Sequence, residues 1–249
     1  MDEFSLTGKT ILVTGASSGI GREVAIRCSK LGAEMVITGR DPERLHVTRD
    51  ALRVTGNTVT RNASRVTDLT VEADMDELVA SLPVLNGIVH CAGIVGPLPS
   101  KFITRADIDK MFGINYYAPV NLTSKILRKK RLADGASVVF MSTIATKNPY
   151  FGGALYSGSK AALEAYSKTL ALEHVARGIR SNCIMAGLVD TPMIENPSEK
   201  NMQEEALERY LKRYPLGIGK PADVAGAVVF FLSDGSRWVT GTSLIMGGE

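Results

Sequence analysis

Residues 10–22 read Thr10-Ile-Leu-Val-Thr-Gly-Ala-Ser-Ser-Gly-Ile-Gly-Arg22, and this stretch decides the fold of the 249-residue chain. Its apolar, β-branched start predicts a buried strand. Glycines follow in the spacing G-x-x-x-G-x-G, and the apolar stripe from Val24 to Leu31 predicts a helix after them. A strand that leads through a glycine-rich turn into a helix is typical of a dinucleotide-binding loop.

The three glycines of such a loop meet three physical needs. One allows a tight turn, one lets the backbone approach a pyrophosphate, and one lets the helix pack closely on the strand. The first N–H groups of the helix then face the phosphates. The candidate cofactor-binding residues of this loop are Gly15, Ser17, Ser18, Gly19, Ile20 and Gly21.

The composition predicts one cytoplasmic domain that spans residues 1–249. Hydrophobic residues make up 45% of the chain, enough for a sizeable core, and no linker or repeat divides it. The three cysteines form no C-x-x-C pair, no export signal is apparent, and the apolar run 225–232 is too short to span a membrane. A scattered net charge of +3 argues against nucleic-acid binding, and three isolated histidines argue against a metal site.

Strands and helices are expected to alternate along the chain. Strands are predicted at 11–13, 35–38, around 59, 87–91, 136–141, 181–185 and 244–246, and helices from 42 (capped by Asp41) and at 74–82, about 104–131, 154–176 and 221–232. Strict alternation with apolar strands means a parallel sheet covered on both faces. We therefore expect an α/β protein with a doubly wound parallel sheet (a Rossmann fold) of about seven strands.

The end of the predicted second strand reads Thr38-Gly39-Arg40. In dinucleotide-binding folds, an acidic residue about 20 positions beyond the glycines binds the ribose 2′-hydroxyl of NAD. Gly39 stands where that acid is expected, and Arg40 offers a guanidinium suited to a 2′-phosphate. We therefore expect NADP(H) as the cofactor; the alternative is a solvated arginine in a surface turn.

A second informative stretch, Tyr156-Ser-Gly-Ser-Lys160, lies near the start of the predicted helix 154–176. Tyr156 and Lys160 are four residues apart, so they share one face of that helix. An ammonium group near a phenol favours the phenolate and lowers the tyrosine pKa from about 10 toward the working range. Such a tyrosine can act as a general acid on a carbonyl or as a general base on an alcohol.

The chain resembles the short-chain dehydrogenase/reductase family over essentially its whole length, including members of the 3-oxoacyl carrier-protein reductase type. The motifs that carry the resemblance are Thr14–Gly21, Cys91-Ala-Gly93, Asn115, Tyr156–Lys160, Gly187–Pro192 and Gly247-Gly248. The resemblance implies hydride transfer between a nicotinamide cofactor and a ketone or secondary alcohol. It also implies a homotetramer or homodimer, with the predicted helices 104–131 and 154–176 at the interface.

The resemblance also implies a role for individual residues. Tyr156 would be the proton donor, Lys160 would hold the nicotinamide ribose and lower the tyrosine pKa, and Asn115 would position a water that links Lys160 to solvent. A charged insert at about 190–216 would close over the substrate. The cofactor-binding residues that the resemblance adds, on the adenosine side and at the nicotinamide end, are Cys91, Ala92, Gly93, Gly187, Val189 and Thr191.

Among the positions that depart from the family pattern, two bear directly on the candidate site. Thr143 stands thirteen residues before Tyr156, where the family has its catalytic serine. Its neighbour Ser142 also carries a hydroxyl, but adjacent side chains on a strand point to opposite faces. We therefore assign the carbonyl-polarising hydroxyl to Thr143, with Ser142 as the alternative. Arg65 replaces an aspartate that often contacts adenine, and Val66 after it is kept as a cofactor-binding residue.

The sequence therefore predicts an NADP(H)-dependent oxidoreductase of a ketone or secondary alcohol, with 3-oxoacyl thioesters, free or bound to a carrier protein, as one substrate class. An alternative within the same class is the reduction of a sugar, a steroid or another small carbonyl compound. An alternative of a different class is an NADP(H)-binding sensor with weak catalysis. Nucleic-acid and membrane partners are not expected.

Overall fold

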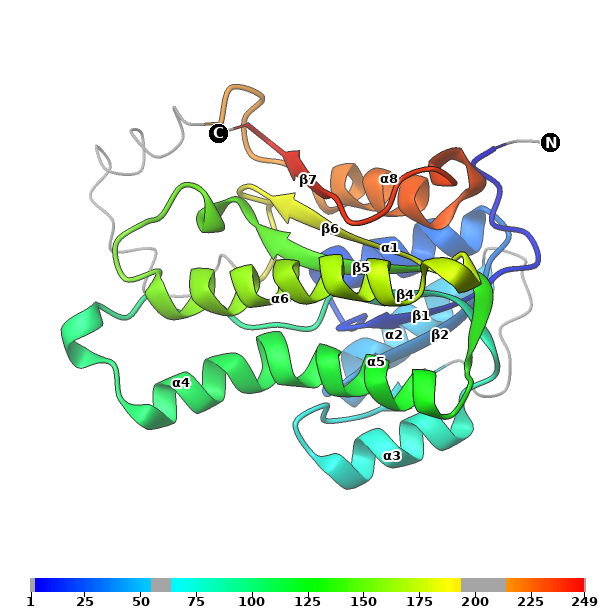
Figure 1. The fold of residues 1–249 in the computed structure, drawn as a ribbon, viewed down its shortest axis with the longest axis horizontal. Coiled ribbons are helices and arrows are strands. Elements are labelled where there is room, and N and C mark those ends of the chain that lie inside the picture. Colours follow the sequence, from blue (N-terminus) through cyan, green and yellow to red (C-terminus); the bar gives the residue numbers. More distant parts are fainter. Residues whose placement is uncertain (1–2, 55–63, 194–213, 249) are drawn as a thin grey trace.

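A seven-stranded parallel sheet forms the centre of the computed structural model, which describes residues 3–54, 64–193 and 214–248. The strands lie in the order β3-β2-β1-β4-β5-β6-β7 (Figure 1). Their bounds are β1 Thr10–Thr14, β2 Glu34–Gly39, β3 Ser64–Val66, β4 Leu85–His90, β5 Leu132–Thr143, β6 Arg180–Ala186 and β7 Ser243–Met246. The order reverses beside β1, which is the switch point of a doubly wound sheet, so the predicted fold class is confirmed.

Helices cover both faces of this sheet. Their bounds are α1 Gly19–Lys30, α2 Pro42–Val54, α3 Glu72–Ser81, α4 Arg105–Phe112, α5 Ala118–Arg128, α6 Ala154–Glu173 and α8 Pro221–Leu232. Figure 1 shows α3, α5 and α6 in front of the sheet, with α1 and α2 behind it. Within the described part of the chain, no helix is long and apolar enough to cross a bilayer.

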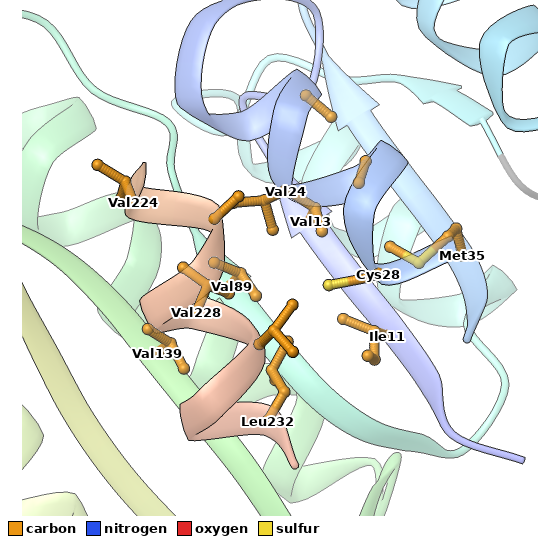
Figure 2. Packing of buried hydrophobic residues seen from close by; sticks show 14 of the residues in the cluster. Ile11, Val13, Val24, Cys28, Met35, Val89, Val139, Val224, Val228 and Leu232 are labelled. Atoms are coloured by element: carbon orange, nitrogen blue, oxygen red, sulfur yellow. The ribbon is translucent and has the colours of Figure 1, made fainter. Parts of the chain in front are cut away.

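The core behind the sheet is an apolar cluster between the strands and the helices α1, α2 and α8. Figure 2 shows its centre, where Val24 and Cys28 of α1 and Val228 of α8 meet over the strand residues Ile11 and Val139. Alternate strand positions point to the other face, where Leu12 and its neighbours pack under α3, α5 and α6. The strands β1, β2, β4, β5 and β6 therefore each contribute side chains to two separate cores.

The predicted helix 104–131 is interrupted. A capping box, in which the Thr104 side chain accepts from the Asp107 backbone N–H and the Asp107 carboxylate accepts from the Thr104 N–H, starts α4. A π-helical turn at Gly113–Tyr117 then separates α4 from α5, and α5 ends at Arg128 rather than at residue 131. A π turn depends on tertiary contacts rather than on apolar spacing, so the sequence pattern did not reveal it.

Other element ends also differ from the predictions. The structure has β3 at Ser64–Val66, whereas the predicted position at Val59 lies outside the described residues. Strand β5 begins at Leu132, four residues before the predicted start, because Leu132 pairs with Leu85 and its carbonyl accepts a hydrogen bond from Arg177. Helix α6 ends at Glu173 rather than at residue 176, because a separate 3₁₀ turn follows and ends at a glycine with φ 66°.

The predicted start of α2 is confirmed, whereas most of the predicted substrate lid lies outside the described residues. The Asp41 carboxylate accepts a hydrogen bond of 2.9 Å from the Arg44 N–H, so Asp41 caps α2 as expected. The predicted substrate lid at about 190–216 lies mostly outside the described residues, which stop at Met193 and resume at Tyr214.

Candidate active site

The glycine loop between β1 and α1 rests directly on the chain that follows β4. Gly15 has φ 66°, and a Cβ atom on it would lie 2.7 Å from the Ala92 nitrogen. A Cβ atom on Gly21 would collide with the Gly15 carbonyl oxygen. The Ala92 N–H also donates a 3.2 Å hydrogen bond to Thr14 Oγ1. No larger side chain fits at these two glycines, and the loop is held against the predicted cofactor-binding segment Cys91–Gly93.

The same loop reaches the two predicted ends of the cofactor. On one side, Ser17 Oγ lies 3.1 Å from where a Cβ atom of Gly39 would be, next to the exposed Arg40. On the other side, a Cβ atom on Gly19 would lie 3.3 Å from Thr191 Cβ. The residues predicted to bind a dinucleotide therefore form one continuous row across the carboxyl ends of the strands.

The side chain of Ser18 makes no capping hydrogen bond at the start of α1, and no acidic residue stands in the first turn of that helix. The N–H groups of Ile20 and the residues around it are thus at a helix N-terminus that favours an anion. This local chemistry fits a pyrophosphate.

The end of β3 lies beside the residues predicted to bind the adenosine side of the cofactor. In the register of the sheet, Arg65 stands beside Thr38 and Val66 beside Gly39, and the Val66 side chain is 58% exposed. The pKa of Asp68 is lowered, mainly by the hydrogen bonds that its carboxylate accepts from Thr70, and to a lesser degree by the charge of Arg40. Arg40 therefore lies close to the beginning of the β3–α3 loop, next to Val66.

The segment predicted to bind the nicotinamide end of the cofactor is fixed by backbone contacts. The Gly187 N–H donates to the Met246 carbonyl of β7 at 2.9 Å, and a Cβ atom on Gly187 would lie 2.6 Å from the Tyr214 ring. Val189 forms a bridge with Gly219, whose carbonyl accepts a hydrogen bond from Asp190. The segment that carries Val189 and Thr191 is thereby held beside the glycine loop.

Tyr156 and Lys160 lie one turn apart on α6, as the spacing predicts. The Lys160 ammonium is 6.0 Å from the centre of the Tyr156 ring and donates a 2.8 Å hydrogen bond to the Met141 carbonyl of β5. Lys160 is only 5% exposed, and burial lowers its pKa to about 8. A partly deprotonated lysine near neutral pH is a group that can exchange protons with its surroundings.

The position of Thr143 along the sheet can be compared with that of Tyr156 on α6. Helix α6 runs antiparallel to β5, as a crossover between parallel strands must. One helical turn back from Lys160 to Tyr156 rises about 6 Å toward the carboxyl edge of the sheet. Two strand residues forward from Met141 to Thr143 advance about 6.6 Å in the same direction. Tyr156, in the first turn of α6, and Thr143, the last residue of β5, therefore both lie toward the carboxyl edge of the sheet.

Ser142 and Thr143 have different surroundings. The Ser142 hydroxyl donates a 2.5 Å hydrogen bond to the Glu164 carboxylate of α6, inside the core. Thr143 Oγ1 instead accepts a hydrogen bond of 3.2 Å from the Ala145 N–H, so its own proton is left for another acceptor. This difference favours Thr143 over Ser142 as the carbonyl-polarising group, in agreement with the prediction from strand alternation.

Asn115 is fully buried within the π turn and binds the segment after β4. Its amide forms two hydrogen bonds with Ile94, accepting from the N–H at 2.8 Å and donating to the carbonyl at 3.0 Å. It also donates to Ser159 Oγ, which donates in turn to the Tyr156 carbonyl. A Cβ atom on Gly93 would lie 3.0 Å from Asn115 Oδ1 and 3.4 Å from the Lys160 ammonium. Gly93, Asn115 and Lys160 thus converge.

Sequence reasoning missed two polar residues of this region. Ser159 connects Asn115 to the α6 backbone, and Glu164 holds Ser142. A signal for Glu164 was present, because it continues the four-residue spacing of Tyr156 and Lys160 along the same helix face. No comparable pattern marks Ser159, whose role depends on a helix from another part of the chain.

The assembled groups suit proton transfer rather than nucleophilic catalysis. The phenol of Tyr156, the ammonium of Lys160 and the hydroxyl of Thr143 all lie toward the carboxyl edge of the sheet, where the cofactor is predicted to bind. Burial raises the pKa of both Cys28 and Cys91 to about 12 and that of Cys183 to about 11, so thiolates are scarce at neutral pH. The site can deliver a proton to a carbonyl oxygen or remove one from an alcohol.

Known proteins match the chain over nearly its whole length. The family model described as Enoyl-(Acyl carrier protein) reductase matches residues 15–248. The 3-oxoacyl-[acyl-carrier-protein] reductase FabG of Rickettsia felis is 32% identical and is matched over 98% of this chain and 97% of the relative. The rabbit (Oryctolagus cuniculus) dehydrogenase/reductase SDR family member 4 is 33% identical, over 98% of this chain and 94% of the relative.

A solved structure adds a likeness in three dimensions. It is of a chain from Beutenbergia cavernae assigned as an NAD(P)-dependent gluconate 5-dehydrogenase, with NADP bound at low occupancy. The two chains are 26% identical and superpose with a TM-score of 0.85 over 98% of this chain and 96% of the other.

Proposed function

The chain belongs to the short-chain dehydrogenase/reductase family and is an oxidoreductase of carbonyl and alcohol groups, and from this premise we propose that it uses NADP(H) to interconvert a ketone and a secondary alcohol. The observation that carries the proposal is the position of Lys160, hydrogen-bonded to the Met141 carbonyl with its ammonium 6.0 Å from the Tyr156 ring. This contact aligns the acid–base tyrosine with the end of β5.

The cofactor proposal rests on the fit between the loop and a dinucleotide phosphate. Gly15 and Gly21 leave a bare backbone at the start of α1, where a pyrophosphate would bind. Arg40 directly follows Gly39, which lies against Ser17, and would supply a guanidinium to a 2′-phosphate. Gly39 supplies no carboxylate to a 2′-hydroxyl. The relative with bound NADP agrees with this choice.

In the proposed reduction, Tyr156 donates a proton to the carbonyl oxygen of the substrate, and Thr143 donates a hydrogen bond to that oxygen. A nicotinamide cofactor held by the glycine loop would supply the hydride. Lys160 stabilises the phenolate that remains and, with Asn115 beside it, is the point through which Tyr156 regains a proton. In the reverse direction Tyr156 accepts the alcohol proton.

The substrate class that we favour is the 3-oxoacyl thioester, free or attached to a carrier protein, because the Rickettsia felis relative acts on such a compound by its name. A sugar, a steroid or another small ketone is the alternative, and the Beutenbergia cavernae relative is named for a sugar acid. An NADP(H) sensor with weak catalysis is the alternative of another class, and the presence of Tyr156, Lys160 and Asn115 argues against it.

We further propose a cytoplasmic homodimer or homotetramer with one catalytic domain per chain and a substrate lid at about 190–216. Exposed apolar side chains support the assembly. Leu172 is 76% exposed near the end of α6, and Leu244 and Ile245 are exposed on the edge strand β7. The three cysteines are free, which suits a reducing compartment.

The decisive experiment measures oxidation of NADPH and of NADH with a panel of ketones that includes a 3-oxoacyl thioester and a keto-sugar acid. We expect turnover with NADPH, and a loss of about 100- to 10,000-fold in Tyr156→Phe, because the phenol proton is removed. Turnover that survives in Tyr156→Phe would refute the mechanism. Tight NADPH binding without turnover on any ketone would favour the sensor.

The cofactor preference is tested with Arg40→Ala and the matched control Arg44→Ala, an exposed arginine on α2. We expect NADPH to bind about 10- to 100-fold more weakly to Arg40→Ala, because a charge-assisted hydrogen bond is lost, while NADH binding is unchanged. Direct titration of both cofactors measures this. Equal affinity of the two variants for NADPH would show that Arg40 does not bind the cofactor.

The carbonyl-polarising group is tested by Thr143→Ala against Ser142→Ala. We expect Thr143→Ala to lose most of its turnover and Ser142→Ala to lose little, because the Ser142 proton already belongs to Glu164. Steady-state kcat with a saturating ketone is the measurement. The reverse ranking would show that Ser142 faces the substrate.

A further inference from the structure

A buried carboxylate lies on the catalytic helix and has no part in the reaction proposed above. Glu164 is 8% exposed and stands one turn beyond Lys160 and two turns beyond Tyr156 on the same face of α6. Acidic side chains are almost never fully buried unless their oxygens are paired. Here Oε1 accepts two hydroxyl hydrogen bonds, from Ser142 at 2.5 Å and from Thr146 at 3.0 Å.

The two hydroxyl groups lie on either side of Thr143. Ser142 precedes it at the end of β5, and Thr146 closes the 3₁₀ turn Ile144–Thr146 that follows. Thr146 Oγ1 also lies 3.1 Å from the Thr143 carbonyl oxygen, and the Ala145 N–H donates to Thr143 Oγ1. One carboxylate oxygen therefore binds the hydroxyl groups at both ends of the five-residue segment 142–146, and the Ala145 N–H within that segment holds the hydroxyl of Thr143.

We propose that Glu164 is a positioning residue that sets Thr143 at the correct height and direction relative to Tyr156. This inference rests on the proposed function. The same helix carries Tyr156 and Glu164, so the carboxylate ties the hydroxyl that polarises the carbonyl to the helix that delivers the proton. A misplacement of about 1 Å in such a pair can cost about 100-fold in rate.

The kinetic test compares Glu164→Leu, which removes both acceptor oxygens, with Glu164→Gln, which keeps an acceptor oxygen of the same reach. We expect kcat to fall about 10- to 100-fold in Glu164→Leu and to recover most of that loss in Glu164→Gln. The dissociation constant of NADPH should stay the same, because no contact of Glu164 reaches the glycine loop. Glu173→Leu, an exposed glutamate on the same helix, is the matched control.

A merely structural role is separated from positioning by a double-mutant cycle with Thr143→Ala. If Glu164 acts through Thr143, Glu164→Leu costs little more once the Thr143 hydroxyl is absent. The same fold-loss in both backgrounds would overturn the proposal. If Glu164→Leu does not fold, Thr146→Val takes its place in the cycle, since it removes one of the two tethers with little change of shape.

Hydrogen exchange of the backbone amides tests the tether without any substrate. In Glu164→Leu the amides of residues 145–148 should exchange faster than in the wild type, and in Glu164→Gln they should stay protected. Unchanged amide exchange in Glu164→Leu would overturn the proposal that Glu164 holds this turn. If the wild type turns over no ketone, the proposed function fails, and the exchange result alone still decides whether Glu164 holds the turn.

Discussion

The two faces of the sheet bury very different side chains. On the face of α1, α2 and α8 the core is apolar, and the buried polar groups there bind backbone. At the end of α8 the partly buried Arg180 and Lys9 also donate to backbone, Arg180 to the Phe231 carbonyl and Lys9 to the Leu232 carbonyl. On the face of α5 and α6, the sheet buries a lysine, a glutamate, a histidine and an asparagine side by side with its apolar core.

Neighbouring residues of a central strand point into these two different environments. Val89 of β4 enters the apolar cluster, and the next residue, His90, stacks on Phe140 and bonds Thr123 on the other face. Met141 and Ser142 of β5 divide in the same way. Side chains alternate along a strand, so one face can be almost wholly apolar while the other also buries ionisable groups.

The polar face carries a cost that the apolar face does not. Burial lowers the pKa of Lys160 to about 8 and, together with the charge of Lys160, that of His90 to about 3. Both groups are therefore harder to charge in the folded protein than in the unfolded chain. We infer that the buried ionisable groups of this face serve the reaction and lower the free energy of unfolding. The following experiments test this contrast between the polar and the apolar face.

The largest effect is expected from Lys160→Met on the polar face. Turnover should fall about 1,000-fold, because the phenolate of Tyr156 loses its neighbouring charge. The free energy of unfolding at pH 7 should nevertheless rise, since a buried ammonium is removed. Paired activity assays and denaturant titrations measure the two changes, and a variant that loses both activity and stability would contradict the contrast.

The pH dependence of this stability change has a definite sign. The folded pKa of Lys160 lies below the ordinary value of 10.5, so the unfolded chain binds the proton more tightly. Wild-type stability should therefore gain roughly 3 kcal/mol as the pH rises from about 8 to 10.5, and Lys160→Met should lack this gain.

Leu232→Ala on the apolar face should act in the opposite way. Leu232 is buried beneath α8 against Gly87, so truncation leaves a cavity and should cost about 3–4 kcal/mol of stability. Its kcat should change little, since the site groups lie on the other face. Urea titration and steady-state kinetics check this, and a large fall in kcat at low temperature would show that the two faces are coupled.

His90→Asn should change the acid sensitivity of the protein. Thr123 donates its proton to the Pro119 carbonyl, so His90 donates from Nε2 and is neutral. Its folded pKa is lowered, so the stability it contributes is lost as the pH falls from about 6.5 toward 3, by roughly 3 kcal/mol between pH 7 and 4. His90→Asn should lose less stability over that range, whereas an identical loss would assign the acid sensitivity to other groups.

The smallest effect is expected from Ser137→Ala, on the apolar face. The Ser137 hydroxyl donates a 2.7 Å hydrogen bond to the Phe231 carbonyl, which Arg180 also binds. Because that carbonyl keeps a partner, the loss should be about 1 kcal/mol. Thermal unfolding measures it, and a loss several times larger would mean that this face also depends on single polar contacts.

Local patterns in the sequence predicted the fold and most of the row of site residues. The glycine spacing, the alternation of strands and helices, and the Tyr156–Lys160 pair all depend on neighbours within a few positions of the chain. Contacts that join distant segments were not predictable. Three features each need a partner from another element: the hydrogen bond between Ser142 and Glu164, the hydrogen bonds between Asn115 and Ile94, and the early start of β5.

The assignment of Thr143 over Ser142 lies between these two cases. Strand alternation indicated that only one of the two hydroxyls could face the substrate, and the family spacing selected Thr143. The hydrogen-bond partner of Ser142 could not be predicted from the sequence, because Glu164 lies 22 positions away on α6. The roles of these residues remain predictions until the variants are measured.

The π turn at Gly113–Tyr117 makes the helix intolerant of changes in length. A π turn holds one residue more than an α-helical turn. An in-frame deletion of a single codon there could restore a regular helix with α4 and α5 in nearly the same phase, but it would remove the widened turn that holds Asn115. Asn115 would leave Ile94 and Ser159, although every other residue of the site would be unaltered. In this stretch a gene can accept substitutions far more readily than a gain or loss of one residue.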